Sequence, residues 1–218
     1  MSQGQAQAPV PIVTLWATYG SRLEEVALKL AEELNIPFRK GAFTSQDLKD
    51  AADRAAHDRG ADGWYIVQAI PARGRRFTWR NIFQGVERSL DETRESLVRD
   101  VREQAREGGV FMGRNATVIL GSYPNALHVK LDGPLEERIK RIMKERGVDE
   151  RQAREDQRFE DDVRAQMSIS LFDWDPRSEE GYDLTVQTTH LDTDTIVAII
   201  AGAARAKYEK NYGVKYPA

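Results

Sequence analysis

The chain has 218 residues, of which 40% are hydrophobic and 31% are charged, so it can bury a core and remain soluble. Its net charge of −3 argues against a dedicated nucleic-acid-binding protein, because such proteins are usually basic. The absence of cysteine excludes disulfides and thiolate metal sites and favours a reducing, cytoplasmic location. The longest apolar run, TIVAIIAGAA, is too short to span a bilayer, and the three dispersed histidines predict no metal site.

The N-terminal part of the chain predicts a flexible tail over residues 1–11, followed by a strand, a turn and a helix. PIVTLW is rich in β-branched residues and predicts a buried strand near Ile12–Trp16. Apolar residues at helical spacing from Leu23 to Leu34 predict an amphipathic helix that ends at Asn35 and Pro37. A short second strand is expected near Phe38.

The middle of the chain is more ambiguous. TSQDLKDAADRAAHDRG is typical of a polar helix that ends at Gly60. ARGRRFTWR, residues 72–80, is a basic and aromatic cluster that could clamp a phosphate, bind RNA or form a solvated loop, and the last is favoured. A long helix is expected next, ending at Gly108-Gly109, and a buried strand over Val110–Gly113.

The C-terminal half alternates strands and helices in the same way. Strands are expected over Ala126–Leu131 and Asp183–Gln187, with a helix between Pro134 and Gly147 after the first of them. DERQ, from Asp149 to Gln152, is a capping-box pattern that opens a further helix. A closing helix precedes a C-terminal tail over residues 211–218. Because helices separate the strands, we predict a single α/β domain over residues 12–210 with one parallel sheet.

The turn after the first strand could be a phosphate site or only a helix cap. Unpaired N–H groups and the helix dipole favour an anion at such a turn, and Gly20, Ser21 and Arg22 are its candidate ligands. However, SRLE is itself a capping-box pattern, with Ser21 as the cap. Glu24 and Glu25 would also repel an anion, so the cap is favoured. Asp132, at the end of a strand, could likewise hold a metal or cap the next helix.

Several segments together resemble the cytidylate-kinase-like family of P-loop nucleoside monophosphate kinases, over about residues 12–207. YGSRLEEVALKLAEELNIP is similar to the family's Y-G-S-G-G-R-E-I-A opening and its L-A-E-x-L-x-I-P continuation. GVFMGRNATVIL is similar to V-I-V-G-R-x-A-x-x-I-L, and DQRF lies where the family has D-x-R. NALHVKLDGPLEERIKRIMKERGVDERQARE and DLTVQTTHLDTDTIVAII resemble the family's strand, helix and lid and its closing strand and helix.

The resemblance implies a five-stranded parallel sheet with helices on both faces and a helical lid, about residues 144–168. The implied activity is transfer of phosphate from ATP, with Mg²⁺, to a pyrimidine nucleoside monophosphate such as CMP. By position it assigns Gly20, Ser21 and Arg22 to the phosphate loop, and Arg114 and Asn115 to the acceptor. It assigns a catalytic role to Arg154, Asp156 and Arg158, and a place in the lid to Arg138, Arg141 and Arg151.

The chain departs from the family at the phosphate loop. Where the family has Gly-Gly-Arg after the serine, this chain has Arg22-Leu23-Glu24, so a glycine and a basic residue are lost. Two hypotheses remain open: an active kinase that binds a CMP-like nucleotide and ATP, and an impaired relative that serves as a nucleotide-binding or regulatory protein. A homodimer is a further candidate assembly.

Overall fold

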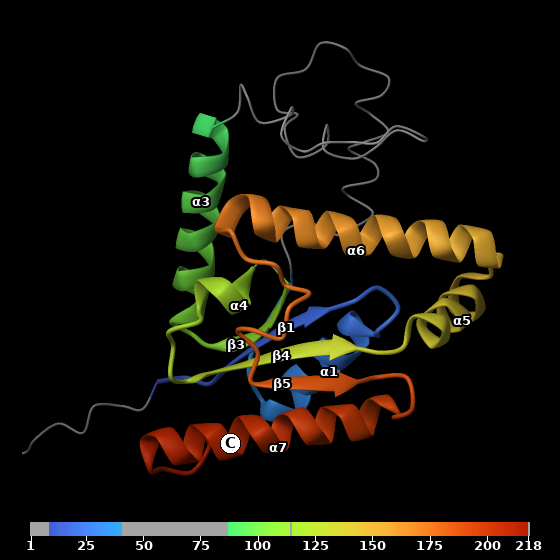
Figure 1. Cartoon of the computed structure of the whole chain (residues 1–218). Coiled ribbons are helices and arrows are strands. Elements are labelled where there is room, and N and C mark those ends of the chain that lie inside the picture. The colour runs from blue at the N-terminus through green and yellow to red at the C-terminus, as the bar shows by residue number, and fades with distance from the viewer. Residues whose placement is uncertain (1–8, 41–86, 114, 218) are drawn as a thin grey trace, which may run out of the picture.

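The computed structural model describes residues 9–40, 87–113 and 115–217, and its core is a five-stranded parallel sheet (Figure 1). The strands, in the order β2-β3-β1-β4-β5, are β1 Ile12–Ala17, β2 Phe38–Arg39, β3 Gly109–Met112, β4 Ala126–Asp132 and β5 Leu184–Gln187. Every neighbouring pair is parallel, so the predicted fold class is confirmed. The expected polar helix and the cluster at residues 72–80 lie outside the described residues.

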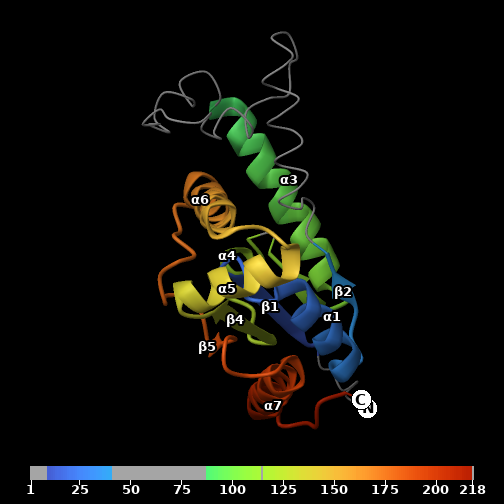
Figure 2. The same ribbon diagram turned by 90° about the vertical axis from the view of Figure 1, so that its right-hand side faces the viewer.

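Helices cover both faces of this sheet. They are α1 Leu23–Leu34, α3 Glu87–Ala105, α4 Ala116–Ile119, α5 Leu135–Arg146, α6 Glu150–Phe172 and α7 Thr193–Tyr212. Figures 1 and 2 show α1 and α7 on one face, and α3, α4 and α6 on the other. None of the helices within the described ranges is both long and apolar enough to cross a membrane.

Each face of the sheet has its own apolar core, because successive strand residues point to opposite sides. Val13 and Leu15 of β1 pack with α1 and α7, whereas Ile12 packs with α3 and α4. All six residues of β1 are buried, as expected for a strand that is covered on both faces. The loops that follow the strands therefore lie at the carboxyl edge of the sheet, next to the ends of the helices.

Capping residues fix the ends of α1 and α5 and the start of α6 at the positions that the sequence predicts. Asn35 and Gly147 adopt left-handed conformations, with φ of 50° and 65°, at the ends of α1 and α5. The carboxylate of Asp149 accepts a hydrogen bond from the backbone N–H of Gln152 at 2.8 Å, so the cap predicted for α6 is confirmed.

A buried polar chain lies inside the face of the sheet that α4 covers. The hydroxyl of Thr14 lies 2.8 Å from Nδ1 of His128 and 3.0 Å from the hydroxyl of Thr117. His128 is 5% exposed, and its Nε2 has no hydrogen-bond partner among the described residues. Burial lowers the pKa of His128 to about 4; Asp183 opposes this shift and Lys207 adds to it.

We expect His128 to make the protein less stable as the pH falls from 6.5 towards 4. In this window the unfolded chain takes up the proton before the folded one, so the free energy of unfolding decreases with decreasing pH. A shift of the pKa from 6.5 to about 4 corresponds to a loss of about 3 kcal/mol. Urea unfolding of the wild type and of His128→Asn, which keeps an acceptor for Thr14, should diverge by this amount. His190→Asn, at an exposed position, is the control, and an equally steep pH dependence in His128→Asn would contradict the assignment.

Candidate functional site

The candidate site is the loop Thr18–Arg22, which connects the carboxyl end of β1 to α1. Such a loop presents backbone N–H groups that the following helix leaves unpaired, and these groups attract anions. Gly20 has φ of 85°, and a Cβ at this position would lie 3.1–3.2 Å from atoms of Ile142 and Arg138. Helix α5 therefore packs directly on the loop, and only glycine fits there without displacement.

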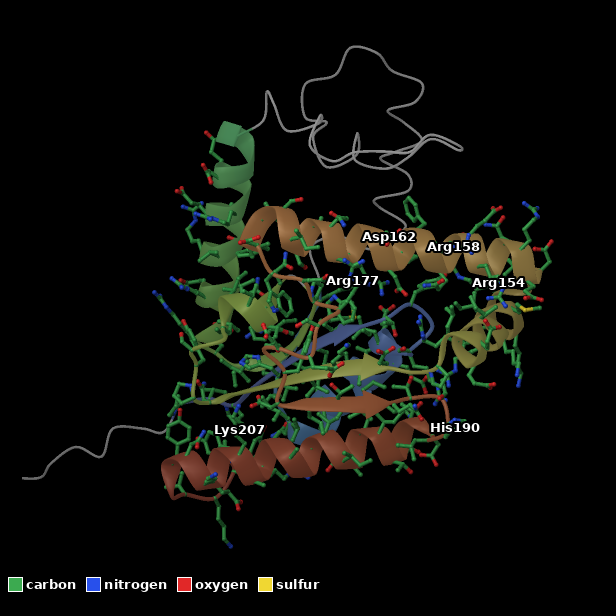
Figure 3. All side chains as sticks on the ribbon, in the orientation of Figure 1. Arg154, Arg158, Asp162, Arg177, His190 and Lys207 are labelled. Carbon is green, nitrogen blue, oxygen red and sulfur yellow. The ribbon has the colours of Figure 1, made fainter. Side chains whose placement is uncertain are left out.

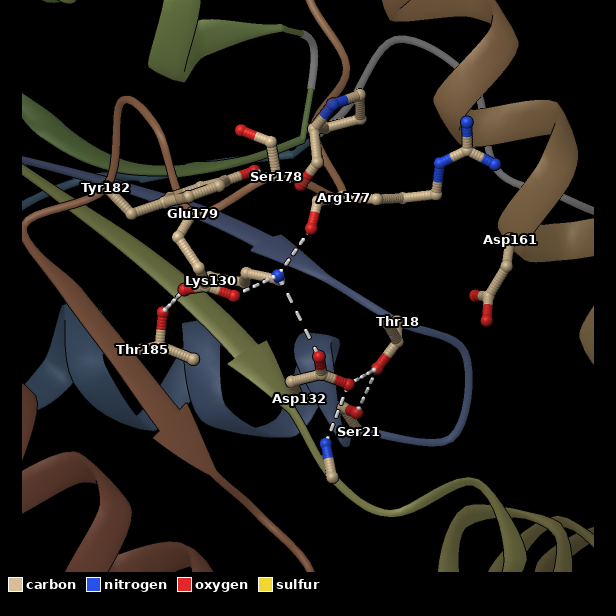
Figure 4. A network of polar contacts seen from close by, with 12 residues as sticks. Thr18, Ser21, Lys130, Asp132, Asp161, Arg177, Ser178, Glu179, Tyr182 and Thr185 are labelled. Carbon is tan, nitrogen blue, oxygen red and sulfur yellow. Dashed lines mark hydrogen bonds and ion pairs between the residues drawn. The ribbon is translucent and has the colours of Figure 1, made fainter.

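The prediction that Ser21 caps α1 is wrong. The N-cap position is taken by Arg22, which makes no side-chain cap bond, and the helix begins at Leu23. The hydroxyl of Ser21 is buried and lies 2.9 Å from the hydroxyl of Thr18. Thr18 in turn donates to the carboxylate of Asp132 at 2.8 Å (Figure 4). Ser21 thus contacts Thr18 within the loop, and Thr18 contacts Asp132 of β4, whereas Ser21 does not cap its own helix.

Asp132, at the end of β4, is the carboxylate that organises this side of the loop. Besides the Thr18 hydroxyl, it accepts the backbone N–H of Gly133 at 2.8 Å. Lys130, which is 3% exposed, lies 3.9 Å from Asp132 and donates to Glu179 and to the carbonyl of Arg177 (Figure 4). Asp132 does not cap α5, whose N-cap position is occupied by Pro134.

Two guanidinium groups converge on the other side of the loop. Arg22 donates to the carbonyl of Thr188 at 3.1 Å and to the hydroxyl of Thr193 at 3.1 Å. Arg141 donates to the same carbonyl at 2.9 Å and to the carbonyl of Gly20 at 2.8 Å. Burial and the neighbouring Arg22 lower the pKa of Arg141. Neither arginine forms an ion pair with a carboxylate in the part of the chain that the structure describes.

Arg138 holds the centre of the loop against both α5 and α6. Its side chain is 8% exposed and donates to the carbonyls of Gly133, at 2.9 Å, and Tyr19, at 2.8 Å. It also lies 3.2 Å from the carboxylate of Asp161 on α6, which accepts the backbone N–H of Tyr19 at 2.6 Å. Sequence reasoning missed Asp161, because it belongs to no motif and its role depends on the position of α6.

The resemblance assigns Arg151 to the lid and Arg154 and Arg158 to catalysis, and Figure 3 shows the last two near the N-terminal end of α6. Arg154 pairs with Glu136 at 2.6 Å and with Glu150 at 2.7 Å, and Arg151 pairs with Glu155 at 3.2 Å. The structure therefore brings Arg22, Arg138 and Arg141 to the loop, but not Arg151 or Arg154. Arg158 is exposed on α6, and Arg114 lies outside the described residues.

Asp156 and Asn115 contact neighbouring elements. Asp156 is buried and accepts from Gln152 at 2.9 Å and from Arg146 at 3.4 Å. Asn115, with φ of 54°, occupies the N-cap position of α4 and accepts a hydrogen bond from Ser168 of α6. These bonds join α6 to α5 near its start and to α4 near its end. Within the described ranges, no group of three or more acidic or histidine side chains could hold a metal ion.

We expect Arg138→Met to lower the free energy of unfolding by about 3 kcal/mol, because it removes a buried cation and leaves the largely enclosed Asp161 carboxylate unpaired. The matched variant Arg151→Met removes an exposed pair and should cost less than about 1 kcal/mol. Urea unfolding of both variants measures the difference. Equal, small losses would show that Arg138 does not organise the loop.

Comparison with solved structures identifies proteins of similar fold. An uncharacterized protein from Eubacterium ventriosum superimposes with a TM-score of 0.61 and 23% identity, covering 90% of this chain and 98% of that one. A gluconokinase from Sinorhizobium meliloti superimposes with a TM-score of 0.51 and 16% identity, covering 95% and 98%. These similarities show a kinase-like fold.

Sequence comparison gives two further matches. A uronate isomerase from Corynebacterium glutamicum is 34% identical over 110 residues, which is 50% of this chain but only 21% of that protein. The chain thus spans about a fifth of the length of this relative. The model of the cytidylate kinase-like family matches residues 12–190, which is most of the chain. The chain belongs to the cytidylate kinase-like family.

Proposed function

We propose that this chain is a nucleotide-binding protein of kinase-like fold that does not transfer phosphate efficiently from ATP. Its ligand is a pyrimidine nucleotide such as CMP, and its role is that of a binding or regulatory protein. This is the second of the two hypotheses that the sequence left open. The phosphotransferase hypothesis, with ATP and Mg²⁺ as cofactors, is the competing outcome of the experiments below.

The convergence of Arg22 and Arg141 on the carbonyl of Thr188 carries this proposal. Two cations that share one neutral acceptor repel each other, and neither has a carboxylate partner in the described ranges. A phosphate group between or beside them would relieve this repulsion, because guanidinium groups match phosphate oxygens in pairs. The geometry therefore favours an anionic ligand at the edge of the loop.

The same loop does not fit the triphosphate of ATP with its Mg²⁺. Arg22 is its sole basic residue and points to the turn between β5 and α7, where it contacts Thr188 and Thr193. The first turn of α1 carries Glu24 and Glu25, and both are exposed. A like charge about 4 Å from a phosphate costs about 1 kcal/mol in water and more in a drier site.

A binding role is also compatible with the acceptor side of the family pattern. The sequence retains Arg114 and Asn115 at the positions that the resemblance assigns to the acceptor nucleotide. Asn115 contacts α6 through Ser168, so a nucleotide that bound beside α4 would meet α6 as well.

We expect Arg22→Gln and Arg141→Gln each to weaken nucleotide binding by about tenfold, since each removes a charged hydrogen-bond donor. Isothermal titration calorimetry with CMP, CTP and ATP, each with and without Mg²⁺, measures this effect. Arg205→Gln is the control, because Arg205 of α7 pairs with Glu33, which lies at the C-terminal end of α1. Binding that is absent in the wild type, or unchanged in both variants, would contradict the proposal.

We expect no phosphoryl transfer above background when the wild type is incubated with ATP, Mg²⁺ and a panel of nucleoside monophosphates. The variant Arg22→Gly/Leu23→Gly/Glu24→Arg restores the family's loop pattern, and a gain of activity in it alone would locate the defect in this turn. Turnover by the wild type at about 1–100 s⁻¹, which is typical of kinases, would refute the proposal. Inactivity of a folded triple variant would show that the defect extends beyond the turn.

A further inference from the structure

Asp161 of α6 is bound to the loop in a way that the function proposed above does not require. Its Oδ1 accepts the backbone N–H of Tyr19 at 2.6 Å. Its Oδ2 accepts from Gln157 at 2.7 Å and from Arg138 at 3.2 Å. The side chain is only 14% exposed, so this carboxylate is a largely enclosed anion with three donors around it.

Tyr19 is held by the two helices that close over the loop. Its backbone carbonyl accepts from Arg138 of α5, and its backbone N–H donates to Asp161 of α6. Two cations lie over its ring, with the guanidinium carbons of Arg146 and Arg164 at 5.6 Å and 5.8 Å from the ring centre. Apolar residues of α5 and α6 pack around the same ring. Opening of α6 must therefore break several contacts to this one residue.

The position of the Asp161 carboxylate is the one that an anionic ligand would favour. A loop that leads into a helix N-terminus attracts a negative group to its backbone N–H donors, and here the negative group belongs to the protein itself. Without Asp161, the Tyr19 N–H and one donor of Arg138 would face the same space without an acceptor. That combination, a backbone N–H beside a guanidinium, is a common way to bind phosphate.

We propose that Asp161 is an internal anion that latches α6 onto the loop Thr18–Arg22 and that a phosphate-bearing ligand must displace it. The latch consists of this chain's own residues, so it does not depend on whether the chain transfers phosphate. The latch inhibits ligand binding at the loop, because Asp161 and an anionic ligand cannot both accept the backbone N–H of Tyr19. The apparent affinity for the ligand is then the intrinsic affinity multiplied by the fraction of molecules in which the latch is open.

The test compares Asp161→Asn, which keeps the size of the side chain, and Asp161→Ala with the neighbouring variant Asp162→Asn. Asp162 is a matched control, because its side chain is 70% exposed and lies 3.8 Å from Arg177, away from the loop. Hydrogen exchange of the Tyr19 amide, followed by NMR without ligand, should be about tenfold faster or more in Asp161→Ala, because its charged acceptor is lost. Asp162→Asn should exchange like the wild type.

Binding of inorganic pyrophosphate provides the second measurement. Because the closed latch is the main state in this proposal, Asp161→Asn and Asp161→Ala should bind pyrophosphate about tenfold more tightly than the wild type and Asp162→Asn. Should Asp161→Ala fail to fold, the isosteric Asp161→Asn still decides the question. Unchanged Tyr19 exchange, or unchanged or weaker pyrophosphate binding in the folded Asp161 variants, would overturn the proposal. Neither readout depends on transfer from ATP, so the latch and the proposed function can fail separately.

Discussion

The buried guanidinium of Arg138 is the constraint on which the arrangement around the loop depends. A charge this far from solvent is stable only if acceptors surround it, and its acceptors come from three places: Gly133 beside its own helix, Tyr19 in the loop and Asp161 on α6. The positions of α5, the loop and α6 are therefore mutually dependent. A movement of α6 away from the sheet must separate this cation from the nearer of its two carboxylates, Asp161, and leave only Asp132 at 3.9 Å.

Backbone strain at Arg22 in the loop is partly compensated by the contacts of its side chain. Arg22 adopts φ of 56°, a conformation that costs a residue with a side chain about 1–2 kcal/mol, where the family resemblance has glycine. Its bonds to Thr188 and Thr193 offset part of that cost and tie α1 to the turn before α7. The same residue therefore fixes the loop and supplies positive charge at its edge.

Two capping-box patterns show why local sequence was sufficient in one place and not in another. Asp149 is exposed, so its carboxylate has no competing partner and accepts the N–H of Gln152 as the pattern predicts. Ser21 stands at the same spacing from Glu24 as Asp149 from Gln152, but it is buried and its hydroxyl lies beside that of Thr18. Its hydroxyl contacts Thr18 in the same loop, and Thr18 in turn donates to Asp132 of β4. The left-handed Arg22 occupies the N-cap position instead of Ser21.

The sequence by itself determined the parallel sheet and the apolar face of α1, because hydrophobic periodicity distinguishes strands from helices. It also determined the ends of α1 and α5, because Asn35 and Gly147 adopt the left-handed conformation that ends a helix. The similarity to the family was also readable from motifs alone. The tertiary structure decided which charged residues meet the loop. Helical spacing assigns Arg151 and Arg154 to one face of α6 but does not say that Glu155 and Glu136 will pair with them. Nor does it say that Asp161 will reach the Tyr19 N–H, since that contact depends on the distance between a helix and a loop 142 residues apart in the chain.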